Sequence, residues 1–370
     1  MANPSEYAEA GVDYGKIAPF KRAMQAVGRR TLEFPRRHHV VVEPMAHGAT
    51  YYFTGSFAHA WVQTTEGLGN KNWIAEWMRL FAGTGRSYYQ GIGIDTALMA
   101  VNDVIAQGAM PVVYTDEVAA GDSAWFEDEP RSRDLAEGFF EVCQQVGMAL
   151  PAGESPALRY LIKAEPPVTS CPSLSGCCTG IIAPSHLAVT GKKLQPGDRI
   201  LGAASSGLHA NGISLVIKRA LALPDKFLTR LPNGNTLGDE ALIPTRSYVA
   251  LVEALQIADV DIHALLPGTG GGIAKLAADP RPFTYRISRW VQVPILFRYL
   301  RELGVSIEDC LTTFNWGIGY YIFVPPAAVE TGIAEGQRAG YELVDLGIVE
   351  SGERCVVFEP EHLTLPPPGD

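Results

Sequence analysis

Hydrophobic positions along the chain alternate between a helical period and a strand period. The clearest helical pattern spans residues 94–107, where Ile94, Leu98, Val101 and Ile105 recur at steps of three or four residues. Further helices are expected at residues 19–28, 72–81, 133–149, 212–223 and 246–257. Strands are expected at residues 39–43, 59–65, 111–119, 176–183, 199–204, 320–324, 343–348 and 355–358.

Glycine and proline mark a boundary between two halves of the chain. Gly191, Pro196 and Gly197 lie close together, and such residues punctuate secondary structure. Strands and helices alternate on both sides of this stretch, which is typical of α/β or α+β domains. We therefore expect an N-terminal α/β domain over residues 1–186 and a C-terminal α+β domain over residues 187–370.

Composition and charge exclude several classes of protein. The chain has 370 residues, of which 47% are hydrophobic and 19% are charged, as in ordinary globular proteins. Its formal charge of -10 argues against a nucleic-acid-binding surface. No apolar run approaches the roughly 20 residues that span a bilayer, and residues 1–16 lack the pattern of a secretory signal. We expect a cytoplasmic protein with neither a membrane nor a nucleic acid as partner.

The six cysteines indicate neither a disulfide framework nor a zinc site. They are sparse for a chain of this length. Cys171, Cys177 and Cys178 cluster, but they lack the paired CxxC spacing of zinc ligands. Free thiols are therefore the expected state.

A glycine turn follows the strand expected at residues 59–65. It contains Glu66, Gly67 and Gly69, and Lys71 immediately precedes the next expected helix. Glycines allow backbone amides to approach a phosphate, and the lysine adds positive charge. The turn does not match the P-loop pattern, so the segment alone favours an ordinary strand-to-helix turn.

Acidic and amide side chains occupy one edge of the helix expected at residues 94–107. Asp95 and Asn102 lie about 20° apart around the helix axis, and Asp103 lies about 80° from Asp95, at about 100° per residue. Magnesium prefers such oxygen ligands together with substrate phosphates. The alternative is a solvated polar face, with Asp95 favoured by the helix dipole. Glu154, flanked by small residues, is either a further ligand or part of a surface turn.

Two segments of the second half could bind an anion or a ribose. His209 and Asn211 follow an expected strand and precede an expected helix. This position suits an anion, although Asn211 could simply cap the helix. Thr269, Gly270 and Gly271 begin a glycine run, whose exposed amides at a helix start favour a phosphate.

The order of these segments is more specific than any one of them. Together they resemble the aminoimidazole ribonucleotide synthetase (phosphoribosylformylglycinamidine cyclo-ligase) family over most of the chain. The segments similar to the family's motifs are residues 7–13, 91–103, 206–215, 244–249, 269–272 and 313–319.

The resemblance implies both a fold and a reaction. The N-terminal sheet is expected to pair with that of a second subunit in a barrel-like homodimer core, with ATP in a groove near the interface. The implied reaction of purine synthesis converts a small-molecule nucleotide, formylglycinamidine ribonucleotide. ATP phosphorylates its formamide oxygen, the amidine nitrogen attacks, the imidazole ring closes, and phosphate leaves.

The resemblance also implies roles for individual residues. The residues expected at magnesium are Asp95, Asp103 and Glu154. Those expected to bind ATP or a substrate phosphate are Glu66, Gly67, Gly69, Asp95, Asn102, Asp103, Thr269, Gly270 and Gly271. Those expected to orient the substrate or to act in catalysis are Lys71, His209 and Asn211.

Departures from the family pattern leave the substrate open. The turn has Glu66 where the family has aspartate, and Asn70 where it has threonine. Residues 155–160 differ from the family sequence that follows Glu154. Two alternatives therefore stay open: a related ATP-dependent enzyme that activates another amide or carbonyl, and a non-catalytic nucleotide-binding paralogue.

Overall fold

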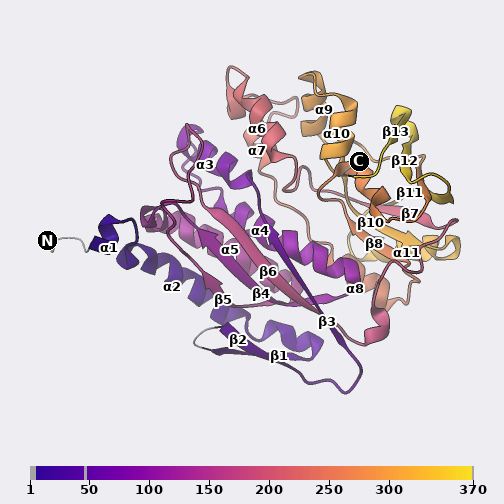
Figure 1. Ribbon diagram of the computed structural model, residues 1–370, viewed down its shortest axis with the longest axis horizontal. Helices are drawn as coiled ribbons and strands as arrows, with labels where there is room; N and C mark the ends of the chain where they lie inside the picture. Colours follow the sequence, from indigo (N-terminus) through magenta and orange to yellow (C-terminus); the bar gives the residue numbers. More distant parts are fainter. Residues whose placement is uncertain (1–5, 46–47, 369–370) are drawn as a thin grey trace. The chain divides into compact units, whose positions relative to one another are not determined.

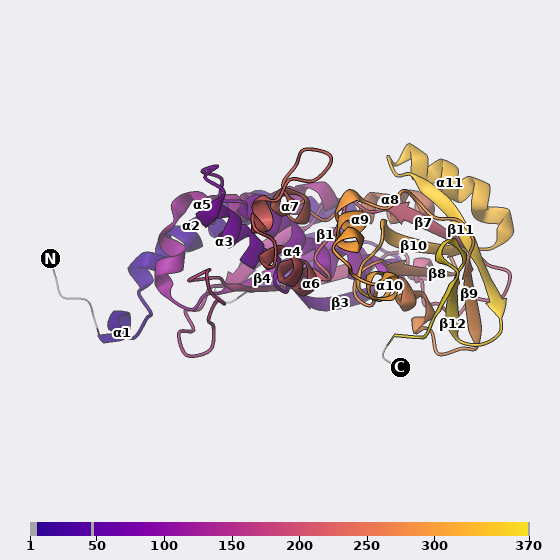
Figure 2. The same cartoon turned by 90° about the horizontal axis from the view of Figure 1, so that it is seen from above.

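The chain divides into two compact units (Figures 1 and 2). The computed structural model describes residues 6–45 and 48–368. The N-terminal unit comprises Met1–Val104 and Met110–Pro184, and the C-terminal unit comprises Ile105–Ala109 and Ser185–Asp370. Each unit combines one main sheet with helices, so the predicted mixed α/β class is confirmed.

A four-stranded sheet forms the centre of the N-terminal unit. Its order is β3-β6-β4-β5, with β6 antiparallel to both neighbours and β5 parallel to β4. The strand bounds are Ala60–Gly67 (β3), Met110–Ala119 (β4), Ala149–Glu154 (β5) and Ser173–Ile182 (β6). A separate antiparallel pair comprises Val40–Met45 (β1) and Gly48–Phe53 (β2).

Helices pack against this sheet, and helix α4, which carries Asp95, Asn102 and Asp103, is largely buried. The helix bounds are Glu6–Glu9 (α1), Tyr14–Thr31 (α2), Lys71–Phe81 (α3), Tyr89–Val104 (α4) and Glu129–Val146 (α5), with short 3-10 helices at Phe34–His38 (η1) and Ser123–Glu127 (η3). Helix α4 packs on β3, β6 and α5 (Figure 1). Helices α4 and α5 approach closely because Gly93 has no side chain: a Cβ there would lie 2.5 Å from the Leu135 carbonyl oxygen. Asp95, two residues later, is also buried.

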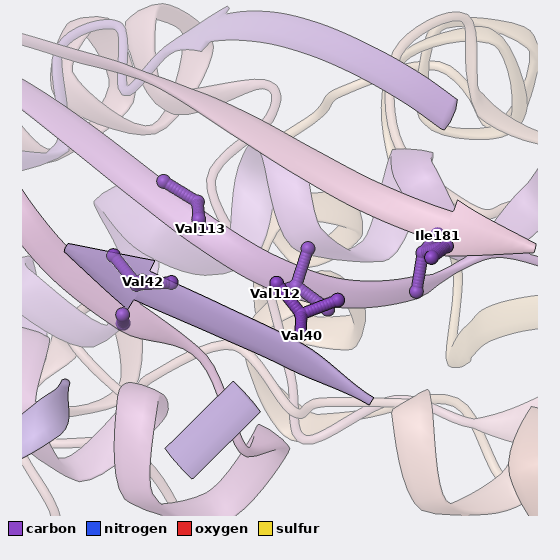
Figure 3. Close-up of a cluster of buried hydrophobic side chains, with 6 residues drawn as sticks. Val40, Val42, Val112, Val113 and Ile181 are labelled. Carbon is purple, nitrogen blue, oxygen red and sulfur yellow. The ribbon is translucent and has the colours of Figure 1, made fainter. Parts of the chain in front are cut away.

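Valines of the β1–β2 pair cover part of the sheet. Val40 and Val42 of β1 are buried together with Val112, Val113 and Ile181 of β4 and β6 (Figure 3). Adjacent residues of a regular strand face opposite sides. The register of β4 shifts just before Val113, which allows both of its valines to join one cluster.

A seven-stranded sheet forms the centre of the C-terminal unit. Its order is β13-β12-β9-β11-β7-β10-β8, and only β9 and β12 among the described neighbours are parallel. The strand bounds are Arg199–Ala204 (β7), Ala264–Pro267 (β8), Phe283–Ile287 (β9), Ile318–Val324 (β10), Leu343–Ser351 (β11), Cys355–Phe358 (β12) and Leu363–Leu365 (β13).

Helices also accompany the second sheet. Their bounds are Ile213–Leu221 (α6), Leu237–Ala241 (α7), Val249–Ile257 (α8), Ile295–Glu302 (α9), Ile307–Thr313 (α10) and Val329–Arg338 (α11). Short 3-10 helices lie at Ile105–Gln107 (η2), Ser185–Leu187 (η4), Lys226–Leu228 (η5), Gly272–Ala278 (η6), Pro326–Ala328 (η7) and Glu359–Glu361 (η8). Helix α11 packs against α8 and against strands β7 and β11 (Figure 2).

The prediction at residues 133–149 is wrong at its C-terminal end. Helix α5 stops at Gly147, whose φ of 75° is left-handed and suits glycine. The chain then enters β5, which was not predicted as a strand and which forms because it pairs with the distant strand β4. Strands β8 and β9 were also missed, and their partners β10 and β11 are likewise distant in sequence. Strands β2 and β13 were missed although each pairs with the strand just before it.

The sequence also predicted the state of the cysteines and the absence of a membrane span. All six cysteines are free thiols, as predicted. Within the described ranges, no helix combines the length and the apolar character needed to cross a bilayer.

Candidate active site

The glycine turn after β3 presents its backbone to solvent. Gly67 and Gly69 are exposed, and Gly69 has a φ of 72°, which favours glycine. Leu68 between them is buried, and its N–H donates to the Leu174 carbonyl at 2.9 Å. The turn is therefore anchored at its centre, while the backbone at Gly67 and Gly69 on either side is exposed. Glu66, the neighbouring carboxylate, is half-buried at the end of β3.

Lys71 and Asp95 form an ion pair in the interior of the N-terminal unit. The distance from Lys71 Nζ to Asp95 Oδ2 is 2.8 Å, and both side chains are 0% exposed. Burial lowers the pKa of the Lys71 ammonium, and the Asp95 carboxylate offsets part of this effect. The pair joins the first residue of α3 to the middle of α4. It holds the end of the glycine turn, and neither group is open to a ligand in this structure.

The remaining residues predicted to bind magnesium or ATP do not form a metal-binding cluster among the described residues. Asn102 is buried in α4, Asp103 is half-buried, and Glu154 is exposed at the end of β5. Among the residues that the structure describes, no three or more histidine, cysteine or acidic side chains form a metal-binding group. The structure therefore does not bring Asp95, Asp103 and Glu154 together as a set of ligands.

A pocket of about 870 Å³ with a mixed polar and apolar lining lies between α2, the middle of β4, strand β5 and the adjoining ends of β1 and β2. Helix α2 contributes Lys21 and Arg29 to its lining, spaced along one side of the helix. The strands contribute Asp116 and Glu154. Cationic and acidic groups therefore line the same pocket, which suits a phosphate group together with a cation.

Asp116 is the group in this pocket that the sequence analysis missed. Its side chain is buried, and it faces Gly153 in the parallel register of β4 and β5. A Cβ on Gly153 would lie 2.1 Å from Asp116 Oδ1, so glycine makes room for the carboxylate. Burial, and then the nearby charge of Glu154, raises the pKa of Asp116 to about 7, although its own backbone N–H partly offsets this. The signal that could have identified Asp116 is a carboxylate at a buried position of a largely apolar strand.

His209 and Asn211 lie on a loop of the C-terminal unit between β7 and α6. His209 is buried with a left-handed φ of 59°, and the Ser206 N–H donates to its Nε2 at 3.3 Å. The Nδ2 of Asn211 is buried, and no hydrogen-bond acceptor for it is present among the described residues. Buried donors are normally satisfied, so this amide is a candidate contact for a ligand.

The glycine run after β8 is an exposed stretch of left-handed backbone. Gly270 and Gly271 are exposed and have φ values of 69° and 79°. Lys275 was not singled out from the sequence, and its Nζ donates to the Thr269 carbonyl at 2.6 Å. Both glycines are required by their conformation, and the lysine adds positive charge where the run begins. Thr269, Gly270 and Gly271 are thus placed together, as a phosphate site requires.

Both units of the fold match one family. Residues 49–182 match the AIR synthase related protein, N-terminal domain, and residues 195–359 match the AIR synthase related protein, C-terminal domain. The chain therefore belongs to the AIR synthase related protein family, and the predicted resemblance is confirmed.

Curated relatives of this chain carry one enzyme name. The chain is 32% identical to the phosphoribosylformylglycinamidine cyclo-ligase of Pyrococcus horikoshii over 97% of each chain. It is 33% identical to the cyclo-ligase of the same name from Thermococcus kodakarensis, over 93% of this chain and 95% of the relative.

Solved structures with the same fold include a hydrogenase maturation protein and a thiamine-monophosphate kinase. The hydrogenase maturation protein HypE in complex with ATP is 18% identical, with a TM-score of 0.64 over 97% of this chain and 95% of that chain. Thiamine-monophosphate kinase from Stenotrophomonas maltophilia is 17% identical, with a TM-score of 0.61 over 93% of this chain and 97% of that chain. At this identity the likeness shows the fold alone.

Proposed function

We propose that the chain is an ATP-dependent cyclo-ligase that converts formylglycinamidine ribonucleotide to aminoimidazole ribonucleotide, with release of ADP and phosphate. The observation that carries the proposal is the 32% identity to a cyclo-ligase over 97% of both chains. The exposed glycine turns in both units support it, because the reaction needs sites for two phosphorylated molecules. A cytoplasmic location stays a prediction from the sequence.

The pocket beside α2 is the proposed site for the ATP phosphates. Lys21 and Arg29 would offset phosphate charge, which phosphoryl transfer requires. Gly67 and Gly69 do not line this pocket, because β3 lies at the other edge of the sheet from β5. Their exposed backbone is proposed as a separate contact for a phosphate. Lys71 acts here by positioning this turn, since its ammonium is enclosed with Asp95.

The residues of this pocket also fit a magnesium ion. Magnesium is commonly held by one or two carboxylates together with substrate phosphates, so a larger protein cluster is not required. Glu154 and Asp116 supply two carboxylates to the pocket, and we assign the ion to them in place of the enclosed Asp95. Bound magnesium would neutralise charge on the transferring phosphoryl group.

The loop of the C-terminal unit is proposed to orient the nucleotide substrate. Asn211 offers an unsatisfied buried amide, and His209 offers an imidazole for proton transfer during ring closure. Thr269, Gly270 and Gly271 would hold the ribose phosphate with exposed amides. Orientation of the amidine nitrogen toward the activated carbon is the main chemical task, because the nucleophile and electrophile belong to one molecule.

The direct test is incubation of the purified protein with ATP, magnesium and formylglycinamidine ribonucleotide. Formation of aminoimidazole ribonucleotide, measured by mass spectrometry together with ADP, is the expected result. ADP formation only with a different amide or carbonyl substrate would support the related enzyme. ATP binding without turnover of any substrate would support the non-catalytic paralogue.

Replacement of Glu154 by glutamine tests the proposed metal site. The amide retains the size of the side chain but loses its charge, so ATP-dependent turnover is expected to fall about 100-fold. The matched control is Glu137→Gln, which removes an exposed carboxylate of α5 that pairs with Arg30 outside the pocket. A Glu154→Gln enzyme with the turnover and magnesium dependence of the control would remove Glu154 from the site.

We also propose that the chain forms a homodimer through an aromatic belt beside the edge strand β3. The belt is a chain of ring contacts through Tyr51, Trp61, His59, Phe53, Phe57 and His39. Trp61 is 39% exposed and Tyr51 is 37% exposed. Exposed apolar patches of this kind mark interaction surfaces, and an unpaired edge strand offers hydrogen bonds to a second sheet.

The dimer proposal predicts a change of mass in solution. Trp61→Glu is expected to convert a dimer to a monomer in sedimentation velocity, because a charge replaces an exposed aromatic ring of the belt. Leu161→Glu is the control, since Leu161 is also exposed but lies on the loop after β5, away from the belt. A monomeric wild-type protein, or a dimer unaffected by Trp61→Glu, would contradict the proposed interface.

A further inference from the structure

Asn315 has every hydrogen-bonding position of its side chain occupied. It lies between α10 and β10 and is 4% exposed. Its Nδ2 donates to the carbonyl oxygens of Gly207 at 2.8 Å and Leu208 at 3.3 Å. Its Oδ1 accepts from Ser205 Oγ at 3.2 Å and from the Gly317 N–H at 2.9 Å. Three of these four bonds reach the loop that carries His209.

The neighbours of Asn315 contact the same loop at further points. The Ser205 N–H donates to the Gly317 carbonyl at 2.8 Å. A Cβ on Gly319 would lie 2.7 Å from His209 Cε1, so the imidazole rests on the backbone of β10. A Cβ on Gly212 would lie 2.3 Å from Phe314 Cε1. Residues 313–319 therefore form a support beneath both ends of the loop.

The supported loop has a conformation that the chain would not adopt alone. His209 has a left-handed φ of 59°, which is uncommon for residues other than glycine. Asn211 Nδ2 is buried without a partner among the described residues. Strained and unsatisfied groups persist only where the surroundings hold them, and they occur preferentially at functional sites. The bonds of Asn315 restrain this loop directly at Ser205, Gly207 and Leu208.

We propose that Asn315 is a positioning residue that sets the loop carrying His209 and Asn211 for the nucleotide substrate. It acts through the loop and does not contact the substrate itself. The kinetic test of this proposal rests on the proposed cyclo-ligase function. An amide is required at this position because two carbonyl oxygens need donors while a hydroxyl and an N–H need an acceptor.

The decisive variant is Asn315→Asp, which retains the shape but replaces both donors by a carboxylate oxygen. The carboxylate repels the carbonyl oxygens of Gly207 and Leu208, so the loop shifts. We expect kcat/KM for formylglycinamidine ribonucleotide at pH 8 to fall about thirtyfold, since small misplacements of reacting groups have large kinetic effects. The KM for ATP is expected to stay within about twofold, because a loss confined to this loop does not alter uniform ATP binding.

The pH profile separates positioning from a general loss of structure. Burial raises the pKa of a carboxyl group, so a growing fraction of the Asn315→Asp molecules gains a proton and a donor at this position as the pH falls from 8 to 6. The activity of Asn315→Asp relative to wild type is therefore expected to rise toward low pH. Asn315→Leu has no donor to recover and is expected to show no such rise.

Tyr341→Phe provides the matched structural control. It removes a buried donor to the Ser247 carbonyl in the same unit, at 2.7 Å, without touching the loop. We expect this variant to have a lower Tm but the kcat/KM of wild type. The proposal would be overturned if folded Asn315→Asp had the kcat/KM of wild type. It would also be overturned if kcat of Asn315→Asp fell only in proportion to its unfolded fraction, with the KM values for both substrates unchanged.

The imidazole of His209 gives a readout that does not depend on turnover. In protein labelled with carbon-13 at histidine Cε1, the His209 signal is identified from its loss in His209→Gln. We expect this signal to shift in Asn315→Asp and to stay in place in Tyr341→Phe. If the wild type makes no imidazole product, the proposed function fails, but an unmoved His209 signal in Asn315→Asp is what overturns the positioning role.

Discussion

Replacement of Lys71 by methionine is expected to lower the free energy of unfolding by about 3–5 kcal/mol. Methionine fills much of the lysine volume, but it removes the ammonium that lies 2.8 Å from Asp95 Oδ2. The Asp95 carboxylate then stays in the interior without its cationic partner, and desolvation of a charge is costly. Urea unfolding of the variant and of wild type at pH 7.5 measures the loss.

The double variant Lys71→Met/Asp95→Leu shows whether charge is the cause. It replaces both charges by apolar groups, and such replacements of buried pairs are often neutral or stabilising. Most of the loss is therefore expected to be recovered. The control Arg30→Met breaks the exposed pair with Glu137, which is 41% exposed, and should cost less than about 1 kcal/mol. A single Lys71→Met variant as stable as this control would disprove the importance of the buried pair.

Replacement of Asp116 by asparagine is expected to raise the free energy of unfolding at pH 8 by up to about 4 kcal/mol. The pKa of Asp116 is raised to about 7 in the folded protein, whereas in the unfolded chain it lies near 3.9. The folded state therefore binds the proton more tightly. This contribution to stability is complete below about pH 4 and is lost as the pH rises to about 7. Asparagine resembles the neutral form at every pH.

Unfolding in urea from pH 5 to pH 8 tests this effect on metal-free protein. A chelator is needed because a cation bound at the pocket would favour the charged carboxylate. The stability gained by Asp116→Asn should grow with pH across this range. Glu117→Gln, which changes the exposed neighbour on β4, should leave the pH dependence as in wild type. An equal effect of Asp116→Asn at pH 5 and pH 8 would contradict the raised pKa.

Local patterns in the sequence predicted the elements that carry their own periodicity. The apolar spacing from Ile94 to Ile105 predicted the helix that becomes α4, followed by the short η2. The pattern at residues 72–81 predicted α3 within one residue. In contrast, β5 was not predicted, and its first residue, Ala149, was assigned to a helix. It is a strand because β4 lies beside it, and that neighbour is invisible to a local pattern.

The order of motifs by itself determined the protein family and pointed to the glycine turns that we propose as phosphate sites. The tertiary structure decided which of their side chains are accessible. Lys71 and Asp95 are each plausible ligands as residue types, but the fold places them against each other in the interior. Asp116 and Asn315 acquire their properties from Gly153 and from the loop at Gly207, which are distant in sequence. Desolvation and charge depend on everything packed around a group, so residue type and spacing alone could not assign these roles.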